Sequence, residues 1–355
     1  MGRRAISTKM AELPPPTLRL GLDHAALADN WRWLDRLSGN AKAGAAVKGN
    51  AYGLGTALVL PTLIKAGARN FFVAHWSEVP DVITFADPGS VSVLHGPMNP
   101  ADAAFARATG VKPVLNSLHQ VALWLESGGG TCDVMIDSGI NRLGISMQDI
   151  GNPLLQKLEV EILMSHLASA DEDSAFNAVQ LQRFRAAAQA IPAKMLSLAN
   201  SAGTALGPDY GFDLTRPGLA LYGGVPRPEL AGKIRQVARP EAVILQRRRI
   251  RTGDTVGYNA IFTASHDMDV GVVSLGYADG FLRCWTGRGA LACGEACLPL
   301  LGKVSMDMVV IDLSAAPHLR EGDWVEVPYD LPRSSQISGL SQYELLTGLG
   351  QRFRR

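Results

Sequence analysis

The segment Ala45-Ala-Val-Lys-Gly-Asn-Ala-Tyr-Gly-Leu-Gly55 places Lys48 at the end of a short apolar run and follows it with a glycine-rich turn. An apolar run bounded by glycine is typical of a buried strand. A lysine at such a strand end is partly desolvated, which lowers its pKa and prepares its amine to attack a carbonyl. The glycines allow the backbone to approach a phosphate closely. The alternative is a solvated lysine beside an ordinary turn, and spacing alone does not separate the two.

Similar apolar runs alternate with stretches of helical periodicity from Leu18 to about Tyr222. This alternation is typical of β-α units around a parallel sheet. The runs are Ala45–Lys48, Phe71–Ala74, Val91–Leu94, Lys112–Leu115, Cys132–Ile136, Val160–Met164, Lys194–Leu198 and Leu219–Tyr222, each but the last followed by an amphipathic or Ala-rich segment. Such a series in about 200 residues predicts a (β/α)8 barrel.

Polar side chains follow the carboxyl ends of several of these runs. They are Lys48, Asp137, His166, Asn200 and Ser201. Barrel enzymes place their sites on that face, although a doubly wound open sheet would produce the same clustering. The pattern therefore predicts a site at the strand ends in either fold.

The pattern of apolar and turn residues changes after about Val237. Short valine-rich runs are then separated by Gly, Pro and Asp turn residues, which favours an all-β domain. We therefore expect an α/β chain: a disordered lead-in over residues 1–14, a TIM-like (β/α)8 barrel over residues 15–236 that carries the candidate site, and a C-terminal β domain over residues 237–355.

Composition restricts the possible partners. The 355 residues carry a formal net charge of only +1, which does not favour nucleic acid or an anionic membrane. No apolar run approaches the roughly 18 residues that span a bilayer, and the N-terminal stretch lacks the apolar core of a secretory signal. The 4 cysteines show no C-x-x-C spacing. We expect a cytoplasmic protein with a small-molecule partner and no metal.

The lysine segment resembles the cofactor-lysine motif of the alanine racemase family. Further segments resemble that family in the same order, from about residue 17 to residue 355. They are Asp137–Gly144, Met164–Glu172, Asn200–Gly203, Arg216–Gly223, Val256–Ala260, Leu275–Gly280, Gly302–Asp307 and Tyr343–Leu346.

The resemblance implies pyridoxal 5'-phosphate as the cofactor, carried by Lys48. It also implies two catalytic bases, with Lys48 serving one face of the substrate Cα and Tyr258 of a neighbouring subunit serving the other. Racemisation of a bound substrate needs acid/base groups on both faces, so two bases are chemically sensible. The expected assembly is a homodimer with composite active sites.

The resemblance also assigns residues to the cofactor. Arg216 is expected to face the pyridine nitrogen, and a guanidinium cannot give that nitrogen a full proton because it stays protonated itself. His166 is expected near the cofactor ring. The phosphate is expected to be held by the hydroxyls or backbone of Tyr52, Ser201, Tyr343, Gly218 and Leu219, since neutral donors at a strand-to-helix turn suit a dianion.

For the substrate, the resemblance points to Arg142, whose guanidinium suits a carboxylate. It adds the backbone of Met306 and the side chain of Tyr277 from the partner chain, with Tyr277 in the entry channel. The small pocket between them implies a small α-amino acid, alanine first.

Two positions depart from the family pattern. Many members have a carbamylated lysine where this chain has Met135, which leaves open what orients Arg142. Some members have a histidine behind the pyridine-facing arginine, where this chain has Ser197. These departures keep open a broad-specificity or serine-preferring racemase. A non-catalytic pyridoxal-phosphate carrier resembles only the barrel, and D-alanine supply for peptidoglycan is not separated from D-alanine catabolism.

Overall fold

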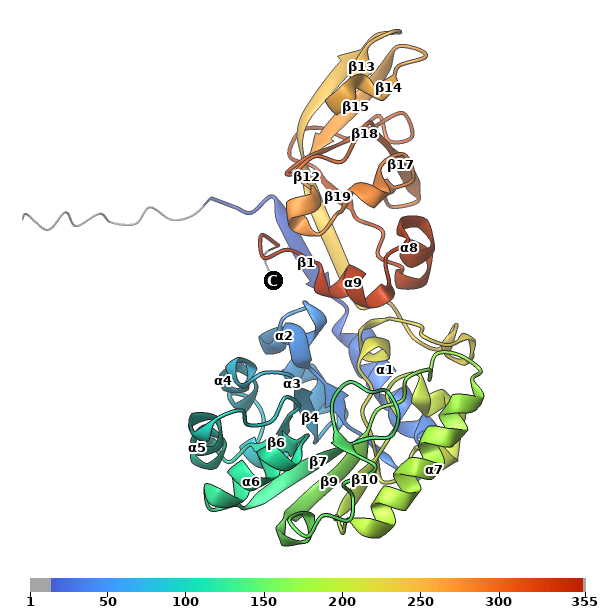
Figure 1. Cartoon of the computed structure of the whole chain (residues 1–355). Helices are drawn as coiled ribbons and strands as arrows, with labels where there is room; N and C mark the ends of the chain where they lie inside the picture. The colour runs from blue at the N-terminus through green and yellow to red at the C-terminus, as the bar shows by residue number, and fades with distance from the viewer. Residues whose placement is uncertain (1–13, 354–355) are drawn as a thin grey trace, which may run out of the picture. The chain divides into compact units, whose positions relative to one another are not determined.

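The computed structural model describes residues 14–353, which form two compact units (Figure 1). We call the first the barrel unit; it contains Gly21–Arg239 and Pro328–Leu349. The second, the β unit, contains Pro240–Val327 and short flanking stretches from both ends of the described chain. Of the predicted lead-in, residues 1–13 lie outside the described residues.

A curled sheet of parallel strands forms the core of the barrel unit. The strands follow one another in the order β10-β9-β7-β6-β5-β4-β3, and the short β8 pairs beside β7. They are β3 (Ala45–Ala46), β4 (Phe71–Val73), β5 (Val91–Val93), β6 (Lys112–Leu115), β7 (Thr131–Asp137), β8 (Ile145–Ser146), β9 (Glu159–Ser165) and β10 (Met195–Ser197). All but β8 coincide with predicted runs, and the TIM-like fold is confirmed.

The last barrel strand differs from the prediction. The predicted strand Leu219–Tyr222 is wrong, because these residues form the 3₁₀ helix η6. All four are buried, and a buried turn gives the same unbroken apolar run as a buried strand. The shorter β11 (Leu214–Thr215) takes that place instead: it pairs in parallel with β2 (Lys42–Ala43), and Arg216 N donates to Ala199 O just beyond β10.

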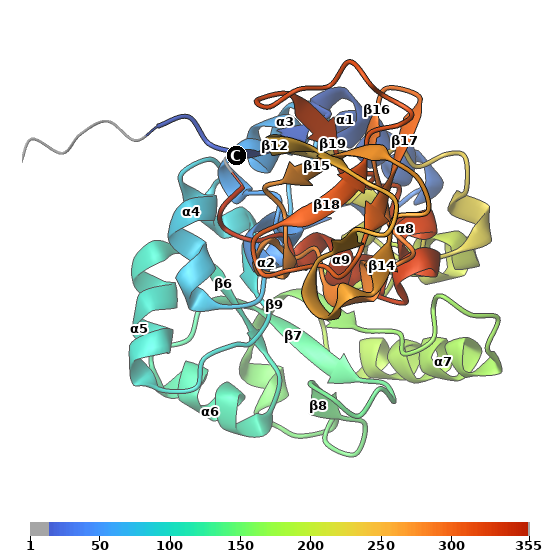
Figure 2. The same cartoon turned by 90° about the horizontal axis from the view of Figure 1, so that it is seen from above.

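Helices cover the outside of the parallel strands (Figure 2). They are α3 (Thr56–Ala66), α4 (Val79–Ile83), α5 (Pro100–Thr109), α6 (Leu118–Glu126) and α7 (Ala175–Ala190). The prediction of a helical segment after each run but the last is wrong after β7, where the chain forms β8 and the 3₁₀ turn η3 (Leu155–Lys157), and after β10, which is followed only by the short 3₁₀ helices η4 (Gly203–Leu206) and η5 (Pro208–Tyr210). For β7, Gly144 shows why: it lies so close to the end of β7 that a Cβ there would be 2.5 Å from Asp137 N.

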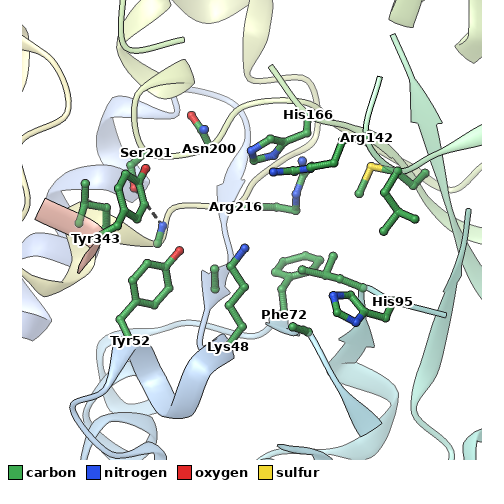
Figure 3. A pocket seen from close by; sticks show the side chains of 17 residues that line it. Lys48, Tyr52, Phe72, His95, Arg142, His166, Asn200, Ser201, Arg216 and Tyr343 are labelled. Atoms are coloured by element: carbon green, nitrogen blue, oxygen red, sulfur yellow. Dashed lines mark hydrogen bonds between the residues drawn. The ribbon is translucent and has the colours of Figure 1, made fainter. Parts of the chain in front are cut away.

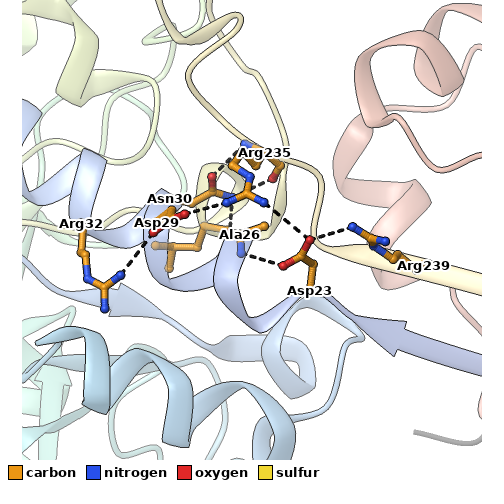
Figure 4. Close-up of polar contacts among 8 residues, drawn as sticks. Asp23, Ala26, Asp29, Asn30, Arg32, Arg235 and Arg239 are labelled. Atoms are coloured by element: carbon orange, nitrogen blue, oxygen red, sulfur yellow. Dashed lines mark hydrogen bonds and ion pairs between the residues drawn. The ribbon is translucent and has the colours of Figure 1, made fainter.

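Polar contacts join the first helix, α1 (His24–Leu37), to the segment that leaves the barrel (Figure 4). Asp23 caps α1 by accepting a hydrogen bond from Ala26 N at 2.9 Å, and its other oxygen pairs with Arg239 at 2.7 Å. These bonds lower the pKa of Asp23. Asn30, fully buried, donates to Arg235 O and accepts from Arg235 N, so side-chain bonds hold the two ends of the barrel sequence together.

Two helices from near the C-terminus belong to the barrel unit: α8 (Leu331–Ser338) and α9 (Gln342–Thr347). The Gln342 amide bonds both the N–H and the carbonyl of Val225, at 2.7 and 3.0 Å. Helix α9 also packs beside α2 (Lys48–Tyr52), where a Cβ on Gly53 would lie 2.5 Å from Leu346 O. This packing brings Tyr343 to the strand ends of the barrel.

Antiparallel strands build the β unit, in the order β1-β12-β15-β18-β17-β16-β19, and β19 also pairs with β12. They are β1 (Leu18–Leu22), β12 (Ala238–Ile250), β15 (Met268–Val273), β16 (Ala290–Cys293), β17 (Ala296–Leu301), β18 (Val309–Asp312) and β19 (Trp324–Glu326), with a hairpin of β13 (Thr255–Val256) and β14 (Phe262–Thr263). The prediction of a separate β domain after about Val237 is confirmed, but it missed helices α8 and α9, which lie within residues 237–355 and belong to the barrel unit. Apolar residues such as Val270 and Leu301 pack inside it.

No helix among residues 14–353 is long and apolar enough to cross a membrane. Within the same range, no three His, Cys, Asp or Glu side chains are grouped as ligands of a metal ion. Cys293 and Cys297 lie on paired strands opposite Ala296 and Ala292, so their side chains point to opposite faces of the hairpin.

Candidate active site

Side chains from the strand ends of the barrel unit line a cavity of about 650 Å³ (Figure 3). Most of the predicted site residues lie there: Lys48, Tyr52, Arg142, His166, Ser201, Arg216, Gly218, Leu219 and Tyr343. Their segments are far apart in sequence but meet at the carboxyl ends of parallel strands. The cavity is therefore placed where barrel enzymes carry their sites.

Lys48 lies two residues beyond the end of β3 and begins an unusual turn. The next four residues have φ angles of 63°, 54°, 53° and 55°, so α2 is a turn of left-handed helix. For residues other than glycine this conformation costs roughly 1–2 kcal/mol each, which here includes Ala51 and Tyr52. Burial lowers the pKa of Lys48, and the charges of Arg142 and Arg216 lower it further. A lowered pKa makes the unprotonated amine available nearer to neutral pH.

A cluster of neutral donors lies at one side of the cavity. Ser201 Oγ accepts hydrogen bonds from the N–H groups of Gly218 at 2.9 Å and Ala220 at 3.1 Å. Its own proton is thus left for an acceptor in the cavity. Gly218 is crowded: a Cβ there would lie 2.2 Å from the Tyr52 hydroxyl, so only glycine fits.

The Tyr52 ring lies between two other tyrosine rings of the barrel unit. Its centroid is 4.9 Å from that of Tyr222 and 6.3 Å from that of Tyr343. Burial raises the pKa of Tyr52 and of Tyr343 above the ordinary tyrosine value. Both hydroxyls therefore stay protonated and can donate, which together with Ser201 makes a donor set suited to a phosphate.

Arg216 is a buried cation, 7% exposed, with its guanidinium held by oxygen atoms. It donates to Ser197 Oγ and to Ser165 O at 2.5 Å each, and to Leu198 O at 3.4 Å. Burial lowers the pKa of Arg216 to about 10, so it remains protonated at neutral pH. Ser197, one of the two departures from the family pattern, thus supports Arg216 directly and in turn donates to Leu214 O.

His166 and Arg142 differ in their surroundings. Desolvation first, and then the nearby cations, lower the pKa of His166 to about 3, so this imidazole is neutral at ordinary pH. The Arg142 side chain is exposed, and across residues 14–353 its guanidinium has no hydrogen-bond or ion-pair partner. Its backbone N–H bonds Asp137, which organises the loop. Met135, the second departure, lines the same cavity but offers Arg142 no hydrogen-bond acceptor.

The remaining predicted site residues lie in the β unit. They are Tyr258, Tyr277 and Met306, and together with Arg283 and Lys303 they line a second hollow of about 540 Å³. The Tyr258 side chain is 65% exposed, on a turn in which Asn259 and Ala260 have positive φ angles. The Arg283 guanidinium lies 5.2 Å from the centre of the Tyr277 ring. Within one chain, the structure brings these residues together in a unit different from that of Lys48.

Phe72 and His95 also line the barrel cavity although the sequence assigned them no role, and Asn200, which was expected at a strand end of the site, lines it too. The Arg216 guanidinium lies 5.9 Å from the centre of the Phe72 ring. His95 follows β5, and its ring meets that of His75 edge-on, with centroids 4.2 Å apart. Asn200 accepts a hydrogen bond from Gly203 N. The polar residues share one signal, their position just beyond a strand.

Comparison with known families covers almost the whole chain. The family described as "Alanine racemase, N-terminal domain" matches residues 22–226, and "Alanine racemase, C-terminal domain" matches residues 237–355. The alanine racemase of Methylobacterium nodulans is 40% identical over 95% of each chain. Agrobacterium fabrum has a catabolic alanine racemase that is 39% identical, over 95% of this chain and 91% of its own length. Its biosynthetic one is 37% identical, over 95% and 93% respectively.

Solved structures show the same likeness. Alanine racemase from Bartonella henselae, described as having covalently bound pyridoxal phosphate, superposes with a TM-score of 0.87 and 32% identity, covering 96% of this chain and 99% of its own. Biosynthetic alanine racemase from Pseudomonas aeruginosa gives a TM-score of 0.84 with 30% identity and the same coverage. The likeness therefore extends over both units of the chain.

Proposed function

This chain belongs to the alanine racemase family and interconverts L- and D-alanine, and we propose that it does so with pyridoxal 5'-phosphate carried by Lys48 and with Lys48 and Tyr258 as its two bases. In one direction the reaction would supply D-alanine for peptidoglycan. In the other it would begin D-alanine catabolism. The observation that carries the cofactor proposal is the composition of the barrel cavity: a desolvated lysine, a buried arginine and a set of neutral donors in one place.

The residues of the cavity fit a phosphorylated pyridine ring. Ser201, Tyr52 and Tyr343 offer hydroxyl donors, and the backbone at Gly218 is left open by the absence of a side chain that would fill the space. Such neutral donors stabilise the phosphate dianion, and the positive charge of Arg216 lies in the same cavity. When bound, pyridoxal phosphate withdraws electrons from the Cα of an attached amino acid and so acidifies its α-proton.

Lys48, Arg216 and His166 each have a proposed role in the reaction. The Lys48 amine takes or returns the α-proton on one face, and its lowered pKa keeps it unprotonated for that role. Arg216 is the proposed neighbour of the pyridine nitrogen, and it keeps its own proton, because three oxygen acceptors hold its guanidinium. Neutral His166 adds no charge beside the ring.

The second base is assigned to Tyr258 of a partner subunit. Tyr258 is exposed and lies in a hollow with Tyr277 and Met306, which supports its availability to a second chain. Arg142, exposed and without a bonding partner in the described chain, is proposed to bind the substrate carboxylate. We therefore propose an obligate homodimer in which each site combines the barrel cavity of one chain with the Tyr258 hollow of the other.

A borohydride experiment tests the cofactor assignment. Reduction of the purified protein should fix pyridoxal phosphate to a single peptide, the one that contains Lys48. Label on Lys42 or Lys303 instead would overturn the assignment.

A substrate panel tests the specificity. We expect alanine to lose optical activity faster than serine, lysine or arginine, because the relatives named above are alanine racemases. Serine racemised faster than alanine would replace this proposal by a serine-preferring racemase. Inert alanine beside a racemised basic amino acid would overturn the substrate assignment.

A further inference from the structure

The carboxylate of Glu78 joins two strand ends of the barrel. Glu78 is the last residue of η1 (Trp76–Glu78), shortly after β4. One of its oxygens accepts hydrogen bonds from Gly49 N at 2.5 Å and Asn50 N at 3.3 Å, and the other accepts from Ala74 N at 2.8 Å and His75 N at 2.9 Å. One side chain thus satisfies four backbone donors from the ends of β3 and β4.

Two of those donors belong to the turn that begins at Lys48. This turn is left-handed over four residues, and such a conformation persists only where its surroundings hold it. Charge-assisted hydrogen bonds to backbone N–H groups are among the stronger polar contacts in proteins. The two bonds from Gly49 and Asn50 therefore fix the backbone of the turn that begins at Lys48, and with it the direction of the Lys48 side chain.

Glu78 also balances the charges that surround the Lys48 amine. Arg142 and Arg216 both act on Lys48 to lower its pKa, in addition to its burial, whereas Glu78 acts in the opposite direction. His95 and His166, from the ends of β5 and β9, also face Lys48, and the pKa of each is lowered. Among the described groups that act on the Lys48 amine, Glu78 is the anion.

We propose that Glu78 is a positioning residue for Lys48: its carboxylate holds the left-handed turn that aims the lysine into the cavity, and it supplies a negative charge that opposes the cations around the amine. This inference rests on the proposed role of Lys48. Its consequence is that Glu78 controls both where the amine lies and at which pH it is free to accept a proton, without touching substrate or cofactor.

The test compares Glu78→Gln with the wild type. Glutamine keeps the shape and one acceptor oxygen, but its NH₂ group would face two N–H donors, and the charge is lost. In full-length protein freed of cofactor, the pH dependence of Lys48 acetylation by acetic anhydride is followed by peptide mass spectrometry. We expect the midpoint for Lys48 to move to lower pH, while that of exposed Lys65 stays constant. An unchanged Lys48 midpoint would overturn the proposal.

Asp81→Asn is the matched control, because Asp81 is exposed in α4 and its loss changes the net charge equally. It should leave the Lys48 midpoint and the racemisation rate as in the wild type. In the loaded enzyme, Glu78→Gln should lower kcat for alanine about 10- to 100-fold while KM changes less than about threefold, because a displaced base slows proton transfer more than it weakens binding. It should also shift the pH titration of the cofactor's visible absorption.

Glu78→Asp separates position from charge and covers the case in which Glu78→Gln does not fold. Aspartate keeps the charge but has a shorter reach, so we expect a lowered kcat with the wild-type labelling midpoint. A midpoint as low as that of Glu78→Gln would show that the charge plays no part and would refute the proposal. Failure of the cofactor assignment would be seen separately, as borohydride labelling away from Lys48, because the acetylation midpoint is measured without cofactor.

Discussion

The two hollows of the chain differ in how far water reaches their side chains. In the barrel cavity, Arg216 is 7% exposed and Ser201 is 2% exposed. In the hollow of the β unit, Tyr258 is 65% exposed and Met306 is 53% exposed. In the barrel cavity, desolvation by burial is the main cause that lowers the pKa of Lys48 and of His166. The barrel unit thus holds a cavity with buried polar groups, whereas the β unit exposes Tyr258, the proposed second base, to solvent.

This difference explains why the chain needs a partner in our proposal. An acid/base group gains most from a dry, fixed setting, and an exposed tyrosine on a turn has neither. A second chain would supply the missing cover. The predictions below test this division of labour, from the largest expected effect to the smallest.

The largest effect is a recovery of activity from two inactive variants. Lys48→Ala and Tyr258→Phe should each lose racemisation, by at least about 10⁴-fold for the lysine and about 10²- to 10⁴-fold for the tyrosine. Mixed in equal amounts with subunit exchange, they should recover about a quarter of wild-type activity, since half of the dimers would carry one intact site.

The control for this recovery is a mixture of either variant with the double variant Lys48→Ala/Tyr258→Phe, which contains no intact composite site. It should stay inactive. Exchange demonstrated by mass spectrometry with no recovered activity would place both bases within one chain.

Replacing Arg216 tests the role of the buried cation in the barrel cavity. Arg216→Gln removes a cation and leaves acceptors at Ser197 and Ser165 without their donors. Because unpaired buried groups typically cost about 1–3 kcal/mol, we expect a loss of thermal stability. Because a positive charge is removed from the cavity, we also expect kcat/KM for alanine to fall about 10- to 100-fold. Arg216→Lys keeps the charge and should lose less. Equal rates in wild type and Arg216→Gln would remove Arg216 from the site.

A smaller effect is expected for Ser201→Ala. The change removes a hydroxyl donor and the acceptor for the N–H groups of Gly218 and Ala220. The dissociation constant for pyridoxal phosphate, measured by fluorescence titration of cofactor-free protein, should rise about tenfold, which corresponds to one or two hydrogen bonds. An unchanged constant would mean that Ser201 acts only as a structural cap of η6.

The smallest effect concerns His166. The pKa of His166 is lowered to about 3, so the imidazole is neutral and does not titrate between pH 6 and 10. His166→Gln should therefore leave the shape of the pH–rate profile unchanged and reduce kcat by less than about tenfold. Loss of an ionisation from the profile would show that His166 titrates during turnover.

The sequence predicted the strands well because buried parallel strands leave uninterrupted apolar runs. The same reasoning failed at Leu219–Tyr222, since a buried 3₁₀ turn produces an identical run, and it missed β11, which is only two residues long. The residues after β7 have no helix because the loop folds back onto the strand end at Gly144. Local patterns do not report such long-range packing.

The site was predictable where a side chain follows a strand, as for Lys48 and Ser201. The contacts that support those side chains could not be predicted from the sequence. Ser197 replaces a histidine of some family members, and its bond to Arg216 depends on two strand ends meeting. The left-handed turn after Lys48 runs against the preferences of Ala51 and Tyr52, so propensity gives no signal for it. Glu78 bonds that turn from 28 or 29 residues away.

The most direct test of the two-base account is α-proton exchange by Tyr258→Phe in deuterated water. The variant keeps Lys48 and its cavity, so one face of the substrate still has a base. We assign D-alanine to the face served by Lys48, so the variant should exchange the α-proton of D-alanine much faster than that of L-alanine while racemisation collapses. Equal residual exchange from both enantiomers, followed by NMR, would mean that one group serves both faces and would contradict the account.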